Sequence, residues 1–203
     1  TSVIMSAELT LSKDRTLNEY QNSIQSMLEE SEKMEHIITG LLALAKMDME
    51  LIHAQRSEIL VADLVNSIKA DWQLQKGLNL SVDINNDVKG FAIFANETLI
   101  RIALDNVISN AFKFSKNQKV SCKLQHQNGE ILIHIEDNGP GISINKVNDI
   151  FKPFYSNAKN LGLNGEGMGL YITQKILEIF KGTIELSQAL PHGCIFTIKL
   201  PTL

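Results

Sequence analysis

Long apolar runs, clustered basic residues and cysteines are all scarce in this sequence, and each absence excludes a class of protein. No run approaches the roughly 18 to 20 apolar residues that a bilayer-spanning helix requires. The Lys and Arg residues form no cluster of the kind that binds nucleic acid, and the formal net charge is −4. Two cysteines, Cys122 and Cys194, make no disulfide framework, so both thiols should pack as small apolar groups in a reducing compartment. We therefore expect a cytoplasmic protein with no nucleic-acid partner.

The start of the chain also lacks two common features. Residues 1–5 carry no basic leader of the kind found in signal peptides, and the first residue is Thr1 rather than Met. This beginning indicates a fragment or a processed chain. We expect any membrane contact of the parent protein to be made only through segments upstream of Thr1.

Proline is absent from the first 55 residues, and Gly40 is the only glycine there. Residues 2–11 can form a short helix, and Thr16 and Glu19 have the spacing of a capping box at the start of a longer one. The longer helix carries an apolar seam with alternating steps of three and four residues, as in helix bundles and coiled coils. The seam residues are Ile24, Leu28, Ile38, Leu42, Ala45, Met49 and Ile52. A helical hairpin is predicted over residues 1–55, either for dimerisation or as a purely structural element.

After residue 55 the sequence predicts a mixture of helices and mostly antiparallel strands, without a regular βαβ alternation. Gly77 should end one helix, and Asn128-Gly129 should form the turn of a β-hairpin. We predict an α+β domain over residues 56–203, a two-layer α/β sandwich with helices on one face of a sheet. Its predicted helices are residues 62–75, 97–114 and 170–180, and its predicted strands are residues 57–60, 78–84, 91–95, 120–125, 131–136, 183–187 and 194–199.

A polar face on the predicted helix 97–114 is the first candidate for a binding site. Asn106 and Asn110 lie one helical turn apart, and Lys113 follows on the same side. An Asn amide oxygen is a hard neutral ligand that suits Mg²⁺, and a Lys ammonium would offset the charge of phosphate. Taken alone, the pattern favours an ordinary exposed polar surface.

Three further segments combine glycines or aromatic residues. Residues 137–142, with the sequence DNGPGI, follow a predicted strand, and Asp137 can accept a hydrogen bond from an exocyclic amine. Residues 151–155, FKPFY, form an aromatic cluster. Residues 165–170, GEGMGL, open a helix, where backbone N–H groups can bind phosphate. Singly, these segments are also typical of turns and of loops anchored on a core.

Taken together and in this order, the four segments resemble the N, G1, F and G2 boxes of sensor histidine kinases. These kinases share their ATP-binding domain with DNA gyrase, mismatch-repair ATPases and the ninety-kilodalton chaperones. The resemblance covers about residues 57–201 and implies a Bergerat-type fold that binds ATP and Mg²⁺. It implies that Asn110 ligates Mg²⁺, that Asn106 supports the phosphate site and that Asp137 reads the adenine amine. The other nucleotide-binding positions that it implies are Lys113, Phe114, Gly139 and Gly141 in the pocket, and Lys159, Gly165, Gly167, Gly169 and Leu170 in or beside a mobile lid.

Asn106 distinguishes a kinase from a hydrolase within this group. In gyrase-like members a Glu stands four residues before the Mg²⁺-binding Asn and activates water. An amide cannot act as a general base at neutral pH. The resemblance therefore implies a kinase that passes the γ-phosphoryl group of ATP to a histidine on the helical hairpin. The implied partners are a second copy, bound through the hairpin as a homodimer, and the receiver domain of a response regulator.

The family's acceptor motif, His-Glu-Leu-Arg-Thr-Pro-Leu, is absent from this chain. Either Ala7 replaces the histidine within residues 6–10, or the histidine lies about seven residues before Thr1, and family spacing favours the second register. No catalytic residue is therefore assigned within the chain, and we expect it to bind ATP without labelling itself. The alternatives are a dimerisation and signalling module with a vestigial ATP site, and an ATP-hydrolysing relative.

Overall fold

The computed structural model describes residues 2–28, 31, 55–116, 119–156 and 167–203. The chain divides into two compact units, Thr1–Ile52 and His53–Leu203. Within the described ranges, no helix combines the length and the apolar character that crossing a membrane would require.

The first unit begins with the predicted short helix, α1 (Ser2–Leu11). Residues 17–28 are helical as well. The backbone N–H of Thr16 donates to Glu19 Oε2 at 2.8 Å, and the N–H of Glu19 donates to Thr16 Oγ1 at 3.3 Å. These two bonds confirm the predicted capping box. Most of the predicted apolar seam, from Ile38 onward, lies outside the described residues.

The second unit contains a five-stranded sheet in which β2 runs parallel to β4 and every other neighbouring pair is antiparallel. In spatial order its strands are β2 (Leu80–Ile84), β4 (Val120–Gln127), β5 (Glu130–Asp137), β7 (Cys194–Pro201) and β6 (Thr183–Gln188). Two further strands, β1 (Ser57–Leu60) and β3 (Ala92–Ala95), pair only with each other.

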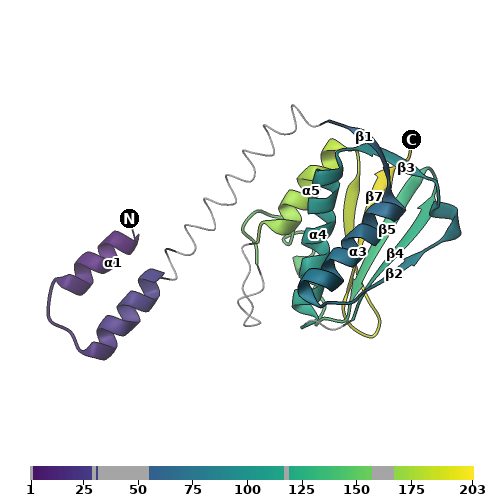
Figure 1. The fold of residues 1–203 in the computed structure, drawn as a ribbon. Coiled ribbons are helices and arrows are strands. Elements are labelled where there is room, and N and C mark those ends of the chain that lie inside the picture. The colour runs from purple at the N-terminus through teal and green to yellow at the C-terminus, as the bar shows by residue number, and fades with distance from the viewer. Residues whose placement is uncertain (1, 29–30, 32–54, 117–118, 157–166) are drawn as a thin grey trace. The chain divides into compact units, whose positions relative to one another are not determined.

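Three helices cover one face of the five-stranded sheet: α3 (Val61–Lys76), α4 (Glu97–Phe114) and α5 (Gly169–Ile179) (Figure 1). Side chains on a central strand of the sheet therefore alternate between the face that the helices cover and the opposite face. In β5 the side chains of Ile131, Ile133 and Ile135 are fully buried, whereas the intervening ones are half-buried. Two short 3₁₀ helices, η1 (Asn86–Val88) and η2 (Ile144–Lys146), complete the described elements. The predicted α+β class with helices on one sheet face is confirmed.

Local signals account for several element ends. Gly77 ends α3 in the left-handed conformation, at φ 64°, as predicted. Asn96 caps α4, because its side-chain oxygen accepts the N–H of Leu99 at 3.0 Å. Asn128 and Gly129, at φ 54° and 78°, join β4 to β5 as the predicted two-residue turn.

Other element bounds differ from the prediction. The strands of the β4–β5 hairpin are longer, because a two-residue turn places Gln127 opposite Glu130 and lets pairing continue to the turn. Strand β2 begins two residues later than predicted, and β3 begins one residue later. Residues 86–88 form a 3₁₀ helix, which is not among the predicted helices. Helix α5 begins and ends one residue earlier than predicted.

Candidate functional site

Helix α4 carries the predicted polar face on a side that the sheet does not cover. Successive residues on an α-helix are 100° apart, so its apolar and polar residues separate into strips. The strip on the sheet is fully buried and consists of Ile100, Leu104, Val107, Ile108 and Ala111. Asn106, Asn110 and Lys113 lie on another side and are half-buried.

Asn106 contacts the beginning of α5. Its Nδ2 donates to the carbonyl oxygen of Gly169 at 3.2 Å. A Cβ atom on Gly169 would lie 3.5 Å from Cγ of Asn106, so the two segments are in van der Waals contact. One turn further along α5, Thr173 Oγ1 donates to the carbonyl oxygen of Ala103 at 3.3 Å in a fully buried position. The polar helix and the last glycine segment are therefore held together at the site.

The C-terminal end of α4 contacts the DNGPGI loop. A Cβ atom on Gly139 would lie 3.1 Å from the carbonyl oxygen of Phe114 and 2.8 Å from Asp137 Oδ1. A side chain at position 139 would therefore crowd the helix end and displace the Asp137 carboxylate. The N–H of Gly139 also donates to Asp137 Oδ1 at 2.7 Å. The first two predicted segments therefore meet at Phe114 and Gly139.

Asp137 is the last residue of β5, and only 3% of its surface is exposed. Burial raises the pKa of its carboxyl group, while hydrogen bonds from the backbone N–H groups of Gly139 and Cys194 act in the opposite direction. Cys194 is its cross-strand partner on β7. The carboxylate is consequently a buried acceptor fixed by backbone donors from two different segments.

Gly193 and Cys194 support Asp137, and neither was predicted to contribute to the site. A Cβ atom on Gly193 would overlap the carbonyl oxygen of Asp137, so only glycine fits there. Burial and the neighbouring Asp137 charge raise the pKa of the Cys194 thiol to about 12. The thiol is free and buried, like that of Cys122, as predicted. The sequence signal that could have identified both residues is their position at the start of the last predicted strand.

The aromatic segment contacts the last glycine segment. A Cβ atom on Gly167, whose φ is 73°, would overlap the carbonyl group of Tyr155 and lie 2.6 Å from the carbonyl carbon of Phe154. Phe154 itself adopts φ 63°, a conformation that non-glycine residues rarely take. The third and fourth predicted segments therefore lie directly against each other.

The remaining predicted positions divide into described and undescribed ones. The Nζ of Lys113 lies 5.5 Å from the centroid of the Phe114 ring. Gly141, at φ 75°, approaches the carbonyl oxygen of Gly193, which a Cβ atom would meet at 3.4 Å. Leu170 is half-buried in the first turn of α5. Lys159 and Gly165 lie outside the described residues.

Comparisons with known proteins indicate the family of the chain. The family described as "Histidine kinase-, DNA gyrase B-, and HSP90-like ATPase" matches residues 95–203, more than half of the chain. The sensor protein SrrB of Staphylococcus aureus strain MRSA252 is 28% identical over 188 residues, which are 91% of this chain and 32% of SrrB. The chain therefore spans about a third of the length of the curated relatives that it matches.

Solved structures share the fold. The catalytic domain of histidine kinase ThkA is 20% identical with a TM-score of 0.62, covering 72% of this chain and 95% of that one. Full-length ShkA, described as a complex with AMPPNP, is 19% identical with a TM-score of 0.65, covering 98% of this chain and 42% of that one. At such identities the likeness shows the fold alone.

The layered sheet and the converging glycine loops define a Bergerat-type ATP-binding domain. The chain belongs to the histidine kinase-, DNA gyrase B- and HSP90-like ATPase family, and its ATP-binding domain is that of a sensor histidine kinase. The predicted resemblance is thereby confirmed.

The buried carboxyl group of Asp137 generates a prediction about stability and pH. Because the folded state raises the pKa of this carboxyl group, its protonated form stabilises the fold at low pH, and that stabilisation is lost as the pH rises through the raised pKa. An Asp137→Asn chain carries no charge there at any pH, and its amide oxygen can still accept from Gly139. We expect it to have a higher melting temperature than the wild type at pH 7 without nucleotide, with the difference shrinking towards pH 4.

Thermal unfolding of both chains across this pH range checks the expectation. Asp83→Asn, which removes an exposed carboxylate on β2, is the matched control and should show little change at any pH. A lower melting temperature for Asp137→Asn at pH 7 would mean that the ionised carboxylate stabilises the fold, contrary to the argument.

Proposed function

We propose that this chain is the kinase core of a sensor histidine kinase, which passes the γ-phosphoryl group of Mg²⁺-ATP to a histidine of its parent protein. The phosphoryl group would then move to an aspartate in the receiver domain of a response regulator. The observation that carries the proposal is that the four predicted segments contact one another: both glycine segments lie against α4, and the aromatic segment lies against the last glycine segment. Gly169 contacts Asn106, Gly139 contacts Phe114, and Gly167 contacts the aromatic segment.

Asp137 is the proposed adenine-reading residue. Its carboxylate is buried, one oxygen accepts the N–H of Gly139, and an ionised carboxylate has further acceptor capacity for an exocyclic amine. Guanine presents a carbonyl oxygen at the corresponding position, which would repel the carboxylate and leave it without a donor. A buried acceptor of this kind discriminates strongly between the two bases.

Asn110 is the proposed Mg²⁺ ligand, with Asn106 and Lys113 supporting the phosphates. The side chain of Asn110 is half-buried, and among the described residues it has no hydrogen-bond partner, so its oxygen is available to a hard cation. When bound, Mg²⁺ would offset the negative charge of the phosphate oxygens. Lys113 would add a cationic group on the same side of the helix.

Asn106 supports phosphoryl transfer rather than hydrolysis. Its amide nitrogen is engaged with Gly169, and an amide has no basic group that could activate water. In the proposed transfer, a bond forms between an imidazole nitrogen and the γ-phosphorus while the bond to the bridging oxygen breaks and ADP leaves. The residues of this chain would act by positioning and charge compensation.

Residues 1–55 are the proposed dimerisation and phosphotransfer segment, and residues 56–203 are the proposed catalytic domain. In the single chain, large apolar side chains of the first unit are exposed: Leu17 by 76%, Ile24 by 61% and Leu28 by 51%. Burying such residues is a driving force for association. A four-helix bundle of two hairpins would bury them.

Nucleotide affinity tests the site. Replacing Asn110→Ala removes the proposed metal ligand, so we expect ADP affinity measured with Mg²⁺ to fall roughly tenfold or more while affinity in EDTA changes little. Asp137→Asn removes a charged acceptor from adenine, so affinity should fall by roughly tenfold or more under both conditions and discrimination against GDP should relax. Isothermal titration gives both quantities.

Asn66→Ala provides the matched control, because Asn66 is an exposed helical Asn on α3. Its nucleotide affinity should equal that of the wild type. Unchanged affinity in both Asn110→Ala and Asp137→Asn would remove the site assignment. No binding by the wild-type chain would favour the alternative of a signalling module with a vestigial site.

Radiolabelling with γ-labelled ATP tests the reaction. The chain has no acceptor motif, so we expect no label on the chain alone. Label should appear on a supplied helical hairpin that carries the family's His box, with the acid lability of a phosphohistidine. The Asn110→Ala chain should fail to label the same hairpin. Labelling of the chain itself would show that one of its own five histidines is an acceptor.

Solution mass tests the proposed homodimer. Because the exposed apolar residues belong to the first unit, we expect a monomer–dimer equilibrium that shifts with concentration in analytical ultracentrifugation. Ile24→Glu should move this equilibrium towards the monomer, whereas Leu74→Glu, at an exposed position on α3, should not. A monomer mass that is independent of concentration for the wild type would exclude dimerisation of this chain.

A further inference from the structure

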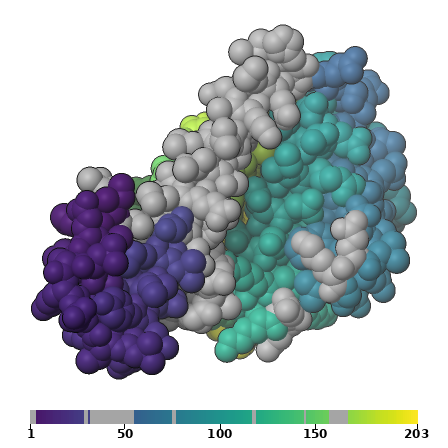
Figure 2. All heavy atoms as spheres, turned by 60° about the vertical axis from the view of Figure 1, so that its left-hand side comes forward, coloured from purple at the N-terminus to yellow at the C-terminus, as the bar shows by residue number. Residues whose placement is uncertain are grey.

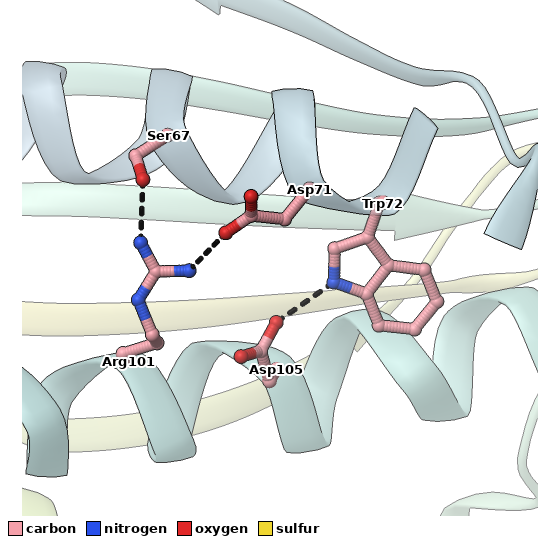
Figure 3. Close-up of polar contacts among 5 residues, drawn as sticks. All are labelled: Ser67, Asp71, Trp72, Arg101 and Asp105. Atoms are coloured by element: carbon pink, nitrogen blue, oxygen red, sulfur yellow. Dashed lines mark hydrogen bonds and ion pairs between the residues drawn. The ribbon is translucent and has the colours of Figure 1, made fainter. Parts of the chain in front are cut away.

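Trp72 on α3 contacts α4 directly beside the candidate site. It is the only tryptophan of the chain and is 5% exposed. Its ring stacks on Phe112, with 5.3 Å between centroids and 19° between planes. Its Nε1 donates to Asp105 Oδ1 at 2.7 Å, and Figure 3 shows the indole pointing its N–H at this carboxylate across the two helices. The contact thus combines a stacked ring with one directional bond.

A second contact lies one turn earlier on the same side of α4. Arg101 donates to Asp71 Oδ2 at 2.8 Å and to Ser67 Oγ at 2.5 Å (Figure 3). In Figure 2 the surfaces of α3, in blue, and α4, in teal, lie side by side. The side chains of Arg101 and Asp71 are 28% and 47% exposed, so solvent weakens this ion pair. The buried Trp72 contact is therefore the stronger constraint on α4.

The residues that Trp72 contacts are sequence neighbours of the proposed ligands. Asp105 immediately precedes Asn106, and Phe112 immediately precedes Lys113. Successive residues on a helix are 100° apart, so the side of α4 that faces α3 is next to the side that faces the site. A rotation of α4 by about 10° would move atoms at its rim by about 1 Å. Displacements of this size at a reacting centre can reduce rates by about a hundredfold.

We propose that Trp72 is a positioning residue for the metal and phosphate side of the site, acting through Asp105 and Phe112 on the rotation of α4. This inference rests on the proposed function. The stacked ring holds α3 and α4 together, and the indole N–H selects one rotation of α4 because its hydrogen bond to Asp105 is directional. Adenine recognition by Asp137 on β5 should not depend on this contact.

The experiment compares ADP affinity with Mg²⁺ and in EDTA for Trp72→Phe, which keeps an aromatic ring on Phe112 but loses the N–H donor. We expect the dissociation constant in EDTA divided by that with Mg²⁺ to shrink about threefold to tenfold, mostly because binding with Mg²⁺ becomes weaker. Affinity in EDTA should stay near the wild-type value. Asp105→Ala should show the same pattern, and the double variant should show little more than either single one, because both remove one interaction.

Val88→Ala is the control for general destabilisation. Val88 is fully buried in η1, which packs against β4. Its melting temperature should fall while its Mg²⁺ ratio matches the wild type. The positioning role would be overturned if Trp72→Phe and Asp105→Ala both kept the wild-type ratio of dissociation constants. It would also be overturned if Val88→Ala lowered this ratio as much as they do. Failure of the wild type to bind nucleotide would instead overturn the proposed function, and with it this inference.

Discussion

The candidate site depends on how α4 is held about its own axis. Its apolar strip packs on the sheet, and burial of side chains such as Leu104 and Ile108 stabilises this contact. Apolar packing is non-directional, however, and it alone does not distinguish small rotations. Polar contacts add direction, among them the bond from Thr173 on α5 to the Ala103 carbonyl and the bond from Trp72 on α3 to Asp105. The side of α4 between these contacts carries Asn106 and Asn110.

The glycines of the site are required by the closeness of neighbouring segments. At Gly167 and Gly193, a side chain would collide with the backbone of another segment, and at Gly139 it would crowd the carbonyl oxygen of Phe114 at 3.1 Å. Each collision involves a carbonyl group, which cannot move aside as the end of a flexible side chain can. The loops around α4 are therefore packed against one another through main-chain atoms. This arrangement leaves little freedom to change any one loop without moving the next.

Local chemistry made much of the fold predictable from the sequence. The bounds of α1 and α4, the end of α3 at Gly77 and the hairpin at Asn128-Gly129 all follow from periodicity, capping and turn residues. Pairing between distant strands did not follow, because no local signal states that β1 pairs with β3 or that β2 runs parallel to β4. Long-range pairing is set by the packing of the whole domain.

The candidate site was predictable in part for the same reason. Amide and glycine positions such as Asn106 and Gly139 follow from a recognisable order of segments. The supports were not predictable: Trp72 is about thirty residues from Asp105, and Cys194 is more than fifty from Asp137. Only the three-dimensional structure brings such pairs together. Support for a site commonly comes from residues that no motif includes.

The position of β7 has a consequence for how the protein is made. This strand is the last regular element of the described chain, and it supplies the neighbours that fix Asp137. A ribosome-bound chain that ends before Gly193 would already contain α4 and the DNGPGI loop, yet Asp137 would lie on a strand, β5, whose edge is still unpaired. Because domains assemble as synthesis proceeds, competence to retain a nucleotide should arise only after Gly193 and strand β7 have emerged.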